Sequence, residues 1–190
     1  MDIIEKAVSV LMRDGLVVYP TETVYGLGAD AFSDEAIVRV YEAKHRPLAM
    51  PVSIGVADYD MLAAVAHVEP WMEGFIQAFL PGPVTVVLAA RTCIPEVLTG
   101  GTGMIGIRIP AHPLAQQLIE RFDSPVTATS ANLHGAKDPQ VPEECTVRHD
   151  FLIDGGRLPG TPSTVVDLPD RKIIRAGTQV DAIAAFLVQL

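Results

Sequence analysis

VVYPTETVYGLGADA, at residues 17–31, is the stretch around which the chain is organised. It begins with a short apolar run that favours a β-strand, and Pro20 ends that strand because it has no backbone N–H to donate. Polar side chains and glycines then follow in close order: Thr21, Glu22, Thr23, Tyr25, Gly26 and Gly28. A strand that runs into a polar, glycine-containing turn is a common way to build a ligand site. A plain polar turn between a strand and a helix fits the local pattern equally well.

Composition narrows the class of protein. The chain has 190 residues, of which 49% are hydrophobic and 19% charged, so one globular domain over residues 1–190 is expected and a disordered chain is excluded. The formal net charge of −9 argues against a general nucleic-acid-binding surface, which needs a basic stripe. There is no charged-then-apolar leader and no apolar run of about 18 residues, so a cytoplasmic protein without a membrane segment is expected.

The spacings of cysteine and histidine predict no metal site. Cys93 and Cys145 are far apart in the chain, and no CxxC is present. The five histidines form no HExxH pattern. Two thiols without a spacing pattern favour a reducing compartment over a disulfide or metal framework.

Hydrophobic periodicity predicts alternating helices and strands. Asp2 and Glu5 have the spacing of a capping box at the start of the first helix. The predicted helices cover residues 2–14, 33–44, 58–66, 69–80, 113–122 and 180–190. The predicted strands cover residues 16–19, 52–56, 84–90, 105–109, 125–129 and 163–167, with a strand and turn at 151–156 and a surface excursion at 136–150. The expected fold is α/β, with one twisted, mixed or largely parallel sheet, helices on both sides and a concave face.

Two cations stand at the end of the helix predicted over residues 33–44. Lys44 and Arg46 flank His45, and Pro47 prevents the helix from continuing. The helix dipole alone explains cations at this end. A lysine beside an arginine fork also suits the oxygens of a phosphate group, so a phosphate clamp is the second interpretation. Since both residues are placed on a helix-terminal loop, replacing either is expected to affect folding little.

One arginine interrupts an otherwise apolar strand. Gly101–Gly106 before it matches GxGxxG, but a strand rather than a helix follows, so the match is not a dinucleotide-binding fingerprint. Arg108 lies in that strand, and a buried cation needs a partner. An internal salt bridge and a fork that holds a ligand carboxylate are both open at this point.

Small polar residues also follow the strand predicted over residues 125–129. Thr129, Ser130 and Asn132 come where open α/β sheets bind ligands, just beyond the end of a strand. An Asx or Ser turn explains the same pattern for Asn132 taken alone.

PTETVYGLGA, at residues 20–29, resembles the signature of the YrdC/Sua5/TsaC family, the threonylcarbamoyl-AMP synthases. Further strings resemble that family in the same order: K-x-R-P at 44–47, PGPVTVVL at 81–88, I-R-I-P-A-H at 107–112, SANLHG at 130–135, I-D-G-G at 153–156, S-T-V-V-D at 163–167 and R-x-G at 175–177. The matches cover nearly the whole chain, which is similar to the single-domain TsaC form. Gly55 departs from the family, because many relatives have histidine there, and this puts one expected substrate contact in doubt.

The resemblance implies a YrdC-like domain that forms threonylcarbamoyl-AMP and pyrophosphate from L-threonine, bicarbonate or CO₂, and ATP, as the start of threonylcarbamoyl adenosine synthesis on tRNA. It also implies Mg²⁺ brought with ATP and a downstream threonylcarbamoyl transferase as a possible partner. Arg108 is then expected to face a wet cavity, with no carboxylate of the protein as an essential partner. The implied catalytic residues are Lys44 and Arg46. The implied threonine-binding residues are Thr23, Arg108, Ala128 and Ser163, and the implied ATP-binding residues are Lys44, Arg46, Ser130, Asn132 and Arg175.

Two other functions stay open on the sequence. One is an RNA-binding module of the same fold, against which the acidic balance speaks. The other is a carbamoyl-adenylate activity that uses carbamoyl phosphate, as in hydrogenase-maturation proteins with this fold. Those proteins are longer and carry acylphosphatase and zinc-finger parts that this sequence lacks.

Overall fold

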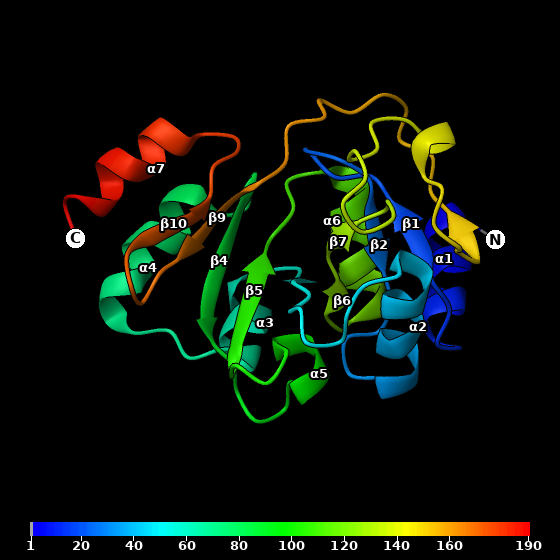
Figure 1. The fold of residues 1–190 in the computed structure, drawn as a ribbon, viewed down its shortest axis with the longest axis horizontal. Coiled ribbons are helices and arrows are strands. Elements are labelled where there is room, and N and C mark those ends of the chain that lie inside the picture. The colour runs from blue at the N-terminus through cyan, green and yellow to red at the C-terminus, as the bar shows by residue number, and fades with distance from the viewer. Residues whose placement is uncertain (1) are drawn as a thin grey trace.

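The structure is a computed structural model that describes residues 2–190. Its strands form two mixed sheets flanked by helices (Figure 1). The order is β10-β9-β4-β5-β3-β6 in the six-stranded sheet and β7-β2-β1-β8 in the four-stranded sheet. The strands are β1 (Val17–Tyr19), β2 (Gly26–Gly28), β3 (Ile54–Gly55), β4 (Val84–Ala89), β5 (Met104–Arg108), β6 (Val126–Thr127), β7 (Thr129–Ser130), β8 (Phe151–Leu152), β9 (Thr164–Asp167) and β10 (Lys172–Arg175). The helices are α1 (Ile3–Leu11), α2 (Asp34–Lys44), α3 (Tyr59–Val65), α4 (Pro70–Phe79), α5 (Glu96–Thr99), α6 (Pro113–Phe122), the 3₁₀ turn η1 (Pro142–Glu144) and α7 (Val180–Leu187).

The six-stranded sheet is built around β4, which pairs parallel with β9 and antiparallel with β5. Alternate residues of β4 are fully buried in an apolar core that also takes the inner faces of α3, α4 and α7. The ring of Phe75 on α4 lies 4.7 Å from that of Phe79 and 5.6 Å from that of Phe186 on α7, in tilted and edge-on arrangements that aromatic rings favour. These contacts hold the last helix against α4 (Figure 1).

The four-stranded sheet is buried on both faces, which explains why β1 is apolar throughout. Successive side chains of a strand point to opposite faces. Val17 and Tyr19 therefore join the core made with α1 and α6, while Val18 joins the core beneath α2.

The two sheets meet where the chain passes from β6 to β7. Thr127 is fully buried there, and its Oγ1 donates to Leu27 O at 2.8 Å and accepts from Ala29 N at 3.0 Å. Tyr19 Oη donates to Thr127 O at 3.0 Å. One threonine thus joins the strand at the edge of the larger sheet to the smaller sheet.

Replacing Thr127 with valine is expected to lower the free energy of unfolding by about 1–3 kcal/mol, because Leu27 O and Ala29 N–H lose their partner in a dry site of unchanged shape. Thr127→Ser keeps the hydroxyl and should retain most of that stability. Urea unfolding of the two variants beside the wild type measures the difference. Equal midpoints for the valine variant and the wild type would contradict this role.

Most of the predicted elements are present, and the mixed α/β class is confirmed. The strands nevertheless divide between two sheets instead of forming one, because the strand predicted over residues 125–129 is interrupted at Ala128, whose N–H donates to Ser53 O at 2.7 Å. The capping box at α1 is wrong, since the Asp2 side chain makes no cap hydrogen bond within the described residues. Ser33 does cap α2, accepting from Ala36 N at 3.2 Å. Between residues 2 and 190, no helix is of the length and apolarity that crossing a bilayer requires.

Candidate functional site

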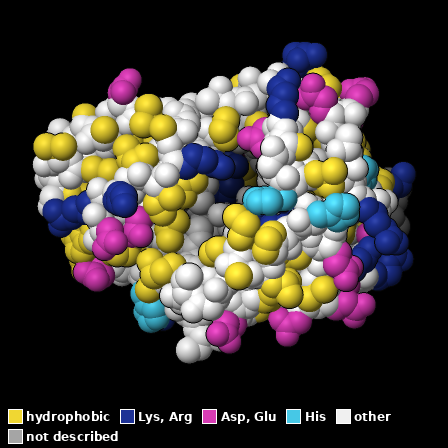
Figure 2. Space-filling model, in the orientation of Figure 1, with side chains coloured by type: hydrophobic (Ala, Val, Ile, Leu, Met, Phe, Trp, Pro, Cys, Tyr) yellow, Lys and Arg dark blue, Asp and Glu magenta, His cyan; other side chains and the backbone are white. Residues whose placement is uncertain are grey.

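A cavity of about 240 Å³ opens between the two sheets. Figure 2 shows Lys and Arg side chains gathered around a hollow near the centre of this face. The end of β5, the β6–β7 passage, the end of α2, the loop after β7 and the start of β9 all contribute to its wall. Every site residue implied by the sequence lines this one cavity: Thr23, Lys44, Arg46, Arg108, Ala128, Ser130, Asn132, Ser163 and Arg175.

Lys44 is the last residue of α2 and is only 2% exposed. Its ammonium donates to Ser130 O, to Asn132 O at 2.7 Å and to Asn132 Oδ1 at 3.3 Å. The pKa of Lys44 is lowered to about 8, mainly by burial and also by the nearby Arg46, while Asp138 opposes the shift. Placing Lys44 on a helix-terminal loop was therefore wrong, because it belongs to the last turn of α2 and its buried side chain joins α2 to the loop after β7.

Arg46 follows the left-handed residue His45, which ends α2 with a φ of 51°. Its Nη2 donates to Pro51 O at 2.8 Å and its Nε donates to Met50 O at 3.4 Å. Burial lowers the pKa of the guanidinium, which stays charged at neutral pH. The fork thus braces the 46–51 loop while lining the cavity.

The loop after β7 forms a polar wall. Ser130 Oγ donates to Asn132 Oδ1 at 2.6 Å, and Asn132 Nδ2 donates to Ala136 O at 2.6 Å and to Asp138 Oδ1 at 3.2 Å. These bonds are not those of the Asx or Ser turn offered as the alternative, in which the side-chain oxygen bonds the backbone two residues further on. The Ser130 and Asn132 side chains instead bond each other and the 136–138 segment, and both line the cavity.

Arg175 and Ser163 form the opposite wall. The guanidinium donates to Ser163 O at 2.9 Å and to Ser163 Oγ at 3.1 Å, both from Nη2. Ser163 Oγ also shares a hydrogen bond of 2.9 Å with Thr85 Oγ1 on β4. Burial lowers the pKa of Arg175 from its ordinary value. This wall joins β10, β9 and β4.

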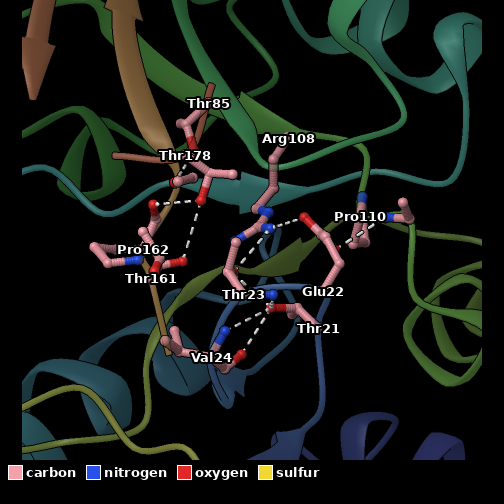
Figure 3. Close-up of polar contacts among 12 residues, drawn as sticks. Thr21, Glu22, Thr23, Val24, Thr85, Arg108, Pro110, Thr161, Pro162 and Thr178 are labelled. Carbon is pink, nitrogen blue, oxygen red and sulfur yellow. Dashed lines mark hydrogen bonds and ion pairs between the residues drawn. The ribbon is translucent and has the colours of Figure 1, made fainter. Parts of the chain in front are cut away.

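Arg108 ends β5 and is 6% exposed. Its Nη2 forms an ion pair with Glu22 Oε1 and donates to Thr23 Oγ1 at 3.3 Å, while Glu22 Oε2 accepts from Ala111 N at 3.0 Å (Figure 3). Its Nε is buried and has no hydrogen-bond partner among residues 2–190. The expectation that Arg108 lacks a carboxylate partner in the protein was wrong. The pair uses one edge of the guanidinium and leaves a donor free.

The cavity has a strong excess of positive charge. Lys44, Arg46, Arg108 and Arg175 line it, while Asp138 is the carboxylate that the described part of the chain places on its wall. Charged groups in a partly closed site act through a lower dielectric than in water. The arrangement therefore suits a ligand that carries several negative charges.

Thr85 and Asp138 are among the lining residues that sequence reasoning missed. Thr85 sits inside an apolar strand and carries no local signal for a site. Asp138 falls in the segment interpreted as a surface excursion. Only the contact of Asp138 with Asn132 and that of Thr85 with Ser163 bring them to the cavity.

Gly55 does not lie on the cavity wall. A Cβ added there would lie 3.3 Å from Ile119 Cδ1 and 3.6 Å from Tyr19 Oη. The position is therefore tightly packed, and a larger side chain would require its neighbours to move.

Comparison with known proteins gives consistent results. The family model described as Telomere recombination, for Sua5, YciO and YrdC, matches residues 9–177. The threonylcarbamoyl-AMP synthase of Pyrococcus abyssi is 41% identical over 166 residues, which are 84% of this chain and 49% of that protein. The threonylcarbamoyl-AMP synthase of Escherichia coli strain K12 is 31% identical over 187 residues, which are 93% of this chain and 96% of that protein.

The fold agrees with a solved structure of the same group. The crystal structure of Pyrococcus abyssi Sua5 complexed with L-threonine superposes with a TM-score of 0.89 at 35% identity, over 95% of this chain and 56% of that one. This chain thus spans about half the length of the Pyrococcus protein and nearly all of the Escherichia coli protein. Because the family model covers most of the chain and the sheets superpose, the chain belongs to the Sua5/YciO/YrdC family.

Proposed function

We propose that this chain is a threonylcarbamoyl-AMP synthase, which forms L-threonylcarbamoyladenylate and pyrophosphate from L-threonine, bicarbonate or CO₂, and ATP. One observation carries the proposal: a single cavity holds a guanidinium with an unused buried donor at one place and three further cations at others. Such a cavity can take a carboxylate and a polyphosphate together. The names of the relatives agree with this reading.

The carboxylate of L-threonine is assigned to Arg108. A guanidinium fork matches a carboxylate in plane and direction, and Nε of Arg108 has no partner among the described side chains. Thr23, Ala128 and Ser163 line the same cavity and complete the proposed threonine site.

The nucleotide is assigned to the cations and to the loop after β7. Lys44, Arg46 and Arg175 would stabilise charge on the phosphates, and Ser130 and Asn132 offer polar groups between them. Lys44 gives its three N–H groups to protein oxygens in this structure, so contact with a phosphate requires it to exchange one of them.

The chemistry needs no side-chain nucleophile. The amine nitrogen of threonine bonds to the carbon of bicarbonate with loss of water, which gives a carbamate. A carbamate oxygen then attacks the α-phosphorus of ATP, and the bond from that phosphorus to pyrophosphate breaks. The chain's part is to hold the reactants in line and to stabilise charge.

Magnesium is proposed to arrive with ATP. Among residues 2–190, no group of three or more His, Cys, Asp or Glu side chains is placed to hold a metal ion. Mg²⁺ prefers oxygen ligands and keeps several waters when it travels with a nucleotide, so Asp138 is the side chain that fits a place beside the hydrated ion. When bound, Mg²⁺ neutralises part of the triphosphate charge.

Association with a downstream threonylcarbamoyl transferase and a cytoplasmic location are part of the same proposal, since the unstable adenylate must be passed to tRNA. The alternative, an RNA-binding module, finds little support in a net charge of −9.

Pyrophosphate release with each substrate omitted in turn tests the proposal. Release from ATP is expected to require both L-threonine and bicarbonate and to fall at least about tenfold without either, because the attacking carbamate contains both and positioning reactants supplies much of such a rate. Equal release without threonine would overturn the proposal.

A further inference from the structure

Two threonine hydroxyls lie at the base of the cavity, at 2% and 1% exposure. Thr21 Oγ1 lies 2.7 Å from Val24 O and 2.8 Å from Thr23 Oγ1 (Figure 3). The backbone N–H groups of Thr23 and Val24 both lie 3.2 Å from the same oxygen and share one of its two lone pairs in a three-centre hydrogen bond, which leaves the other lone pair for Thr23 Oγ1. Thr23 lines the cavity, whereas Thr21 does not.

The positions of the two hydroxyl protons follow from these contacts. A hydroxyl has one proton, and a carbonyl oxygen only accepts. Thr21 must therefore donate to Val24 O, since without a proton a contact of 2.7 Å between two oxygens would be repulsive. The contact of 2.8 Å between the two hydroxyls then needs the proton of Thr23.

Thr23 consequently has no proton to offer the cavity. Its Oγ1 accepts from Arg108 Nη2 at 3.3 Å, which agrees with this assignment and leaves one lone pair. We infer that Thr21 is a positioning residue that fixes Thr23 as a hydrogen-bond acceptor and so selects a substrate with an N–H donor beside its carboxylate. The inference rests on the proposed function, because it takes the carboxylate of the substrate to lie on Arg108.

This arrangement recognises an α-amino acid by the direction of a hydrogen bond. With the carboxylate on Arg108, the α-amino group lies one carbon away and can donate an N–H to Thr23. One N–H held in this way turns the nitrogen lone pair away from Thr23. An acid without a donor on its α-carbon would leave the second lone pair of the Thr23 oxygen without a partner.

Two analogues of L-threonine with the same configuration isolate the effect. One carries a hydroxyl in place of the amino group and the other a fluorine of similar size, which cannot donate. In competition with L-threonine, the wild type is expected to bind the hydroxy acid about tenfold more tightly than the fluoro acid. Thr21→Val releases the proton of Thr23, so the ratio should fall below about threefold, while Thr21→Ser keeps the hydroxyl and should keep the ratio.

The outcomes separate this inference from the proposed function. If Thr21→Val only loosened the turn, the affinities for both analogues would fall by the same factor. An unchanged ratio of the two affinities in that variant would therefore overturn the role of Thr21. If that variant does not fold, equal binding of the two analogues to the wild type, or competition by neither, would still overturn the inference. Threonine-dependent pyrophosphate release would stand in all of these cases, whereas its loss in the wild type would remove the proposed function itself.

Discussion

Arg108→Met is expected to weaken L-threonine binding by roughly 2–5 kcal/mol, the range found when one partner of a buried charge pair is removed. Methionine keeps most of the aliphatic volume of the side chain and removes the donor that is buried without a partner. The affinity for ATP measured without threonine should change by less than about threefold, or roughly 0.7 kcal/mol. Isothermal titration with each substrate separately measures both effects.

The same substitution is also expected to cost stability, because the structure pairs Arg108 with Glu22. The Glu22 side chain is 17% exposed and keeps its hydrogen bond from Ala111 N–H. The free energy of unfolding should therefore fall by about 1–3 kcal/mol, less than for a fully buried pair. The double variant Arg108→Met with Glu22→Gln removes the unpaired charge. It should recover stability without recovering threonine binding.

These two readouts decide the role of Arg108. A folded variant with unchanged threonine affinity and a lower melting temperature would make the arginine purely structural. If the affinities for L-threonine and for ATP fell together, damage to the whole cavity would be the simpler explanation.

Lys44→Met is expected to lower both turnover and stability. Turnover should fall about 10²–10³-fold, as when a preorganised donor to a reacting group is lost elsewhere. Stability should fall by about 1–3 kcal/mol, because the oxygens of Ser130 and Asn132 lose their buried donor. Single-turnover rates at saturating ATP, together with urea unfolding, measure the two losses.

Arg46→Met is the matched control, because the two carbonyl oxygens that Arg46 bonds lie in its own loop and its further contact, from Nη1 to His134 Nδ1 at 3.4 Å, is long and exposed. It should lose turnover with nearly native stability.

Lys44→Arg tests the charge itself. Because the pKa of Lys44 is lowered to about 8, the turnover of the wild type should fall as the pH rises through 8. The turnover of Lys44→Arg should not fall in that range, because arginine stays charged. Native turnover in both methionine variants would show that these cations serve only the loops.

The sequence alone singled out residues that the fold places around one cavity. Thr23, Arg108 and Ser130 lie at or just beyond the ends of apolar runs, Ser163 lies just before one, and all four line one cavity. Strand ends are local features that periodicity and proline mark, so they can be read without the fold. The family resemblance, carried by strings along most of the chain, is confirmed by the match over residues 9–177.

The tertiary structure decided which partner each of these side chains has. Glu22 and Arg108 are 86 residues apart, and Lys44 lies 86 residues from Ser130. No local pattern encodes such pairs, because they depend on how elements far apart in the chain pack against each other. The lysine that the sequence placed on a helix-terminal loop is therefore buried and bonded to a second loop, and the arginine expected to lack a carboxylate partner has one.

The tertiary structure also decides which hydroxyl donates and which accepts in each hydrogen bond. The sequence offers Thr21 and Thr23 as two equivalent hydroxyls, and only the folded turn gives one of them a carbonyl oxygen and the other the cavity. A local sequence pattern determines which chemical groups are present at a strand end. The three-dimensional contacts determine which of those groups keep a free donor or acceptor, because a hydroxyl has only one proton to give.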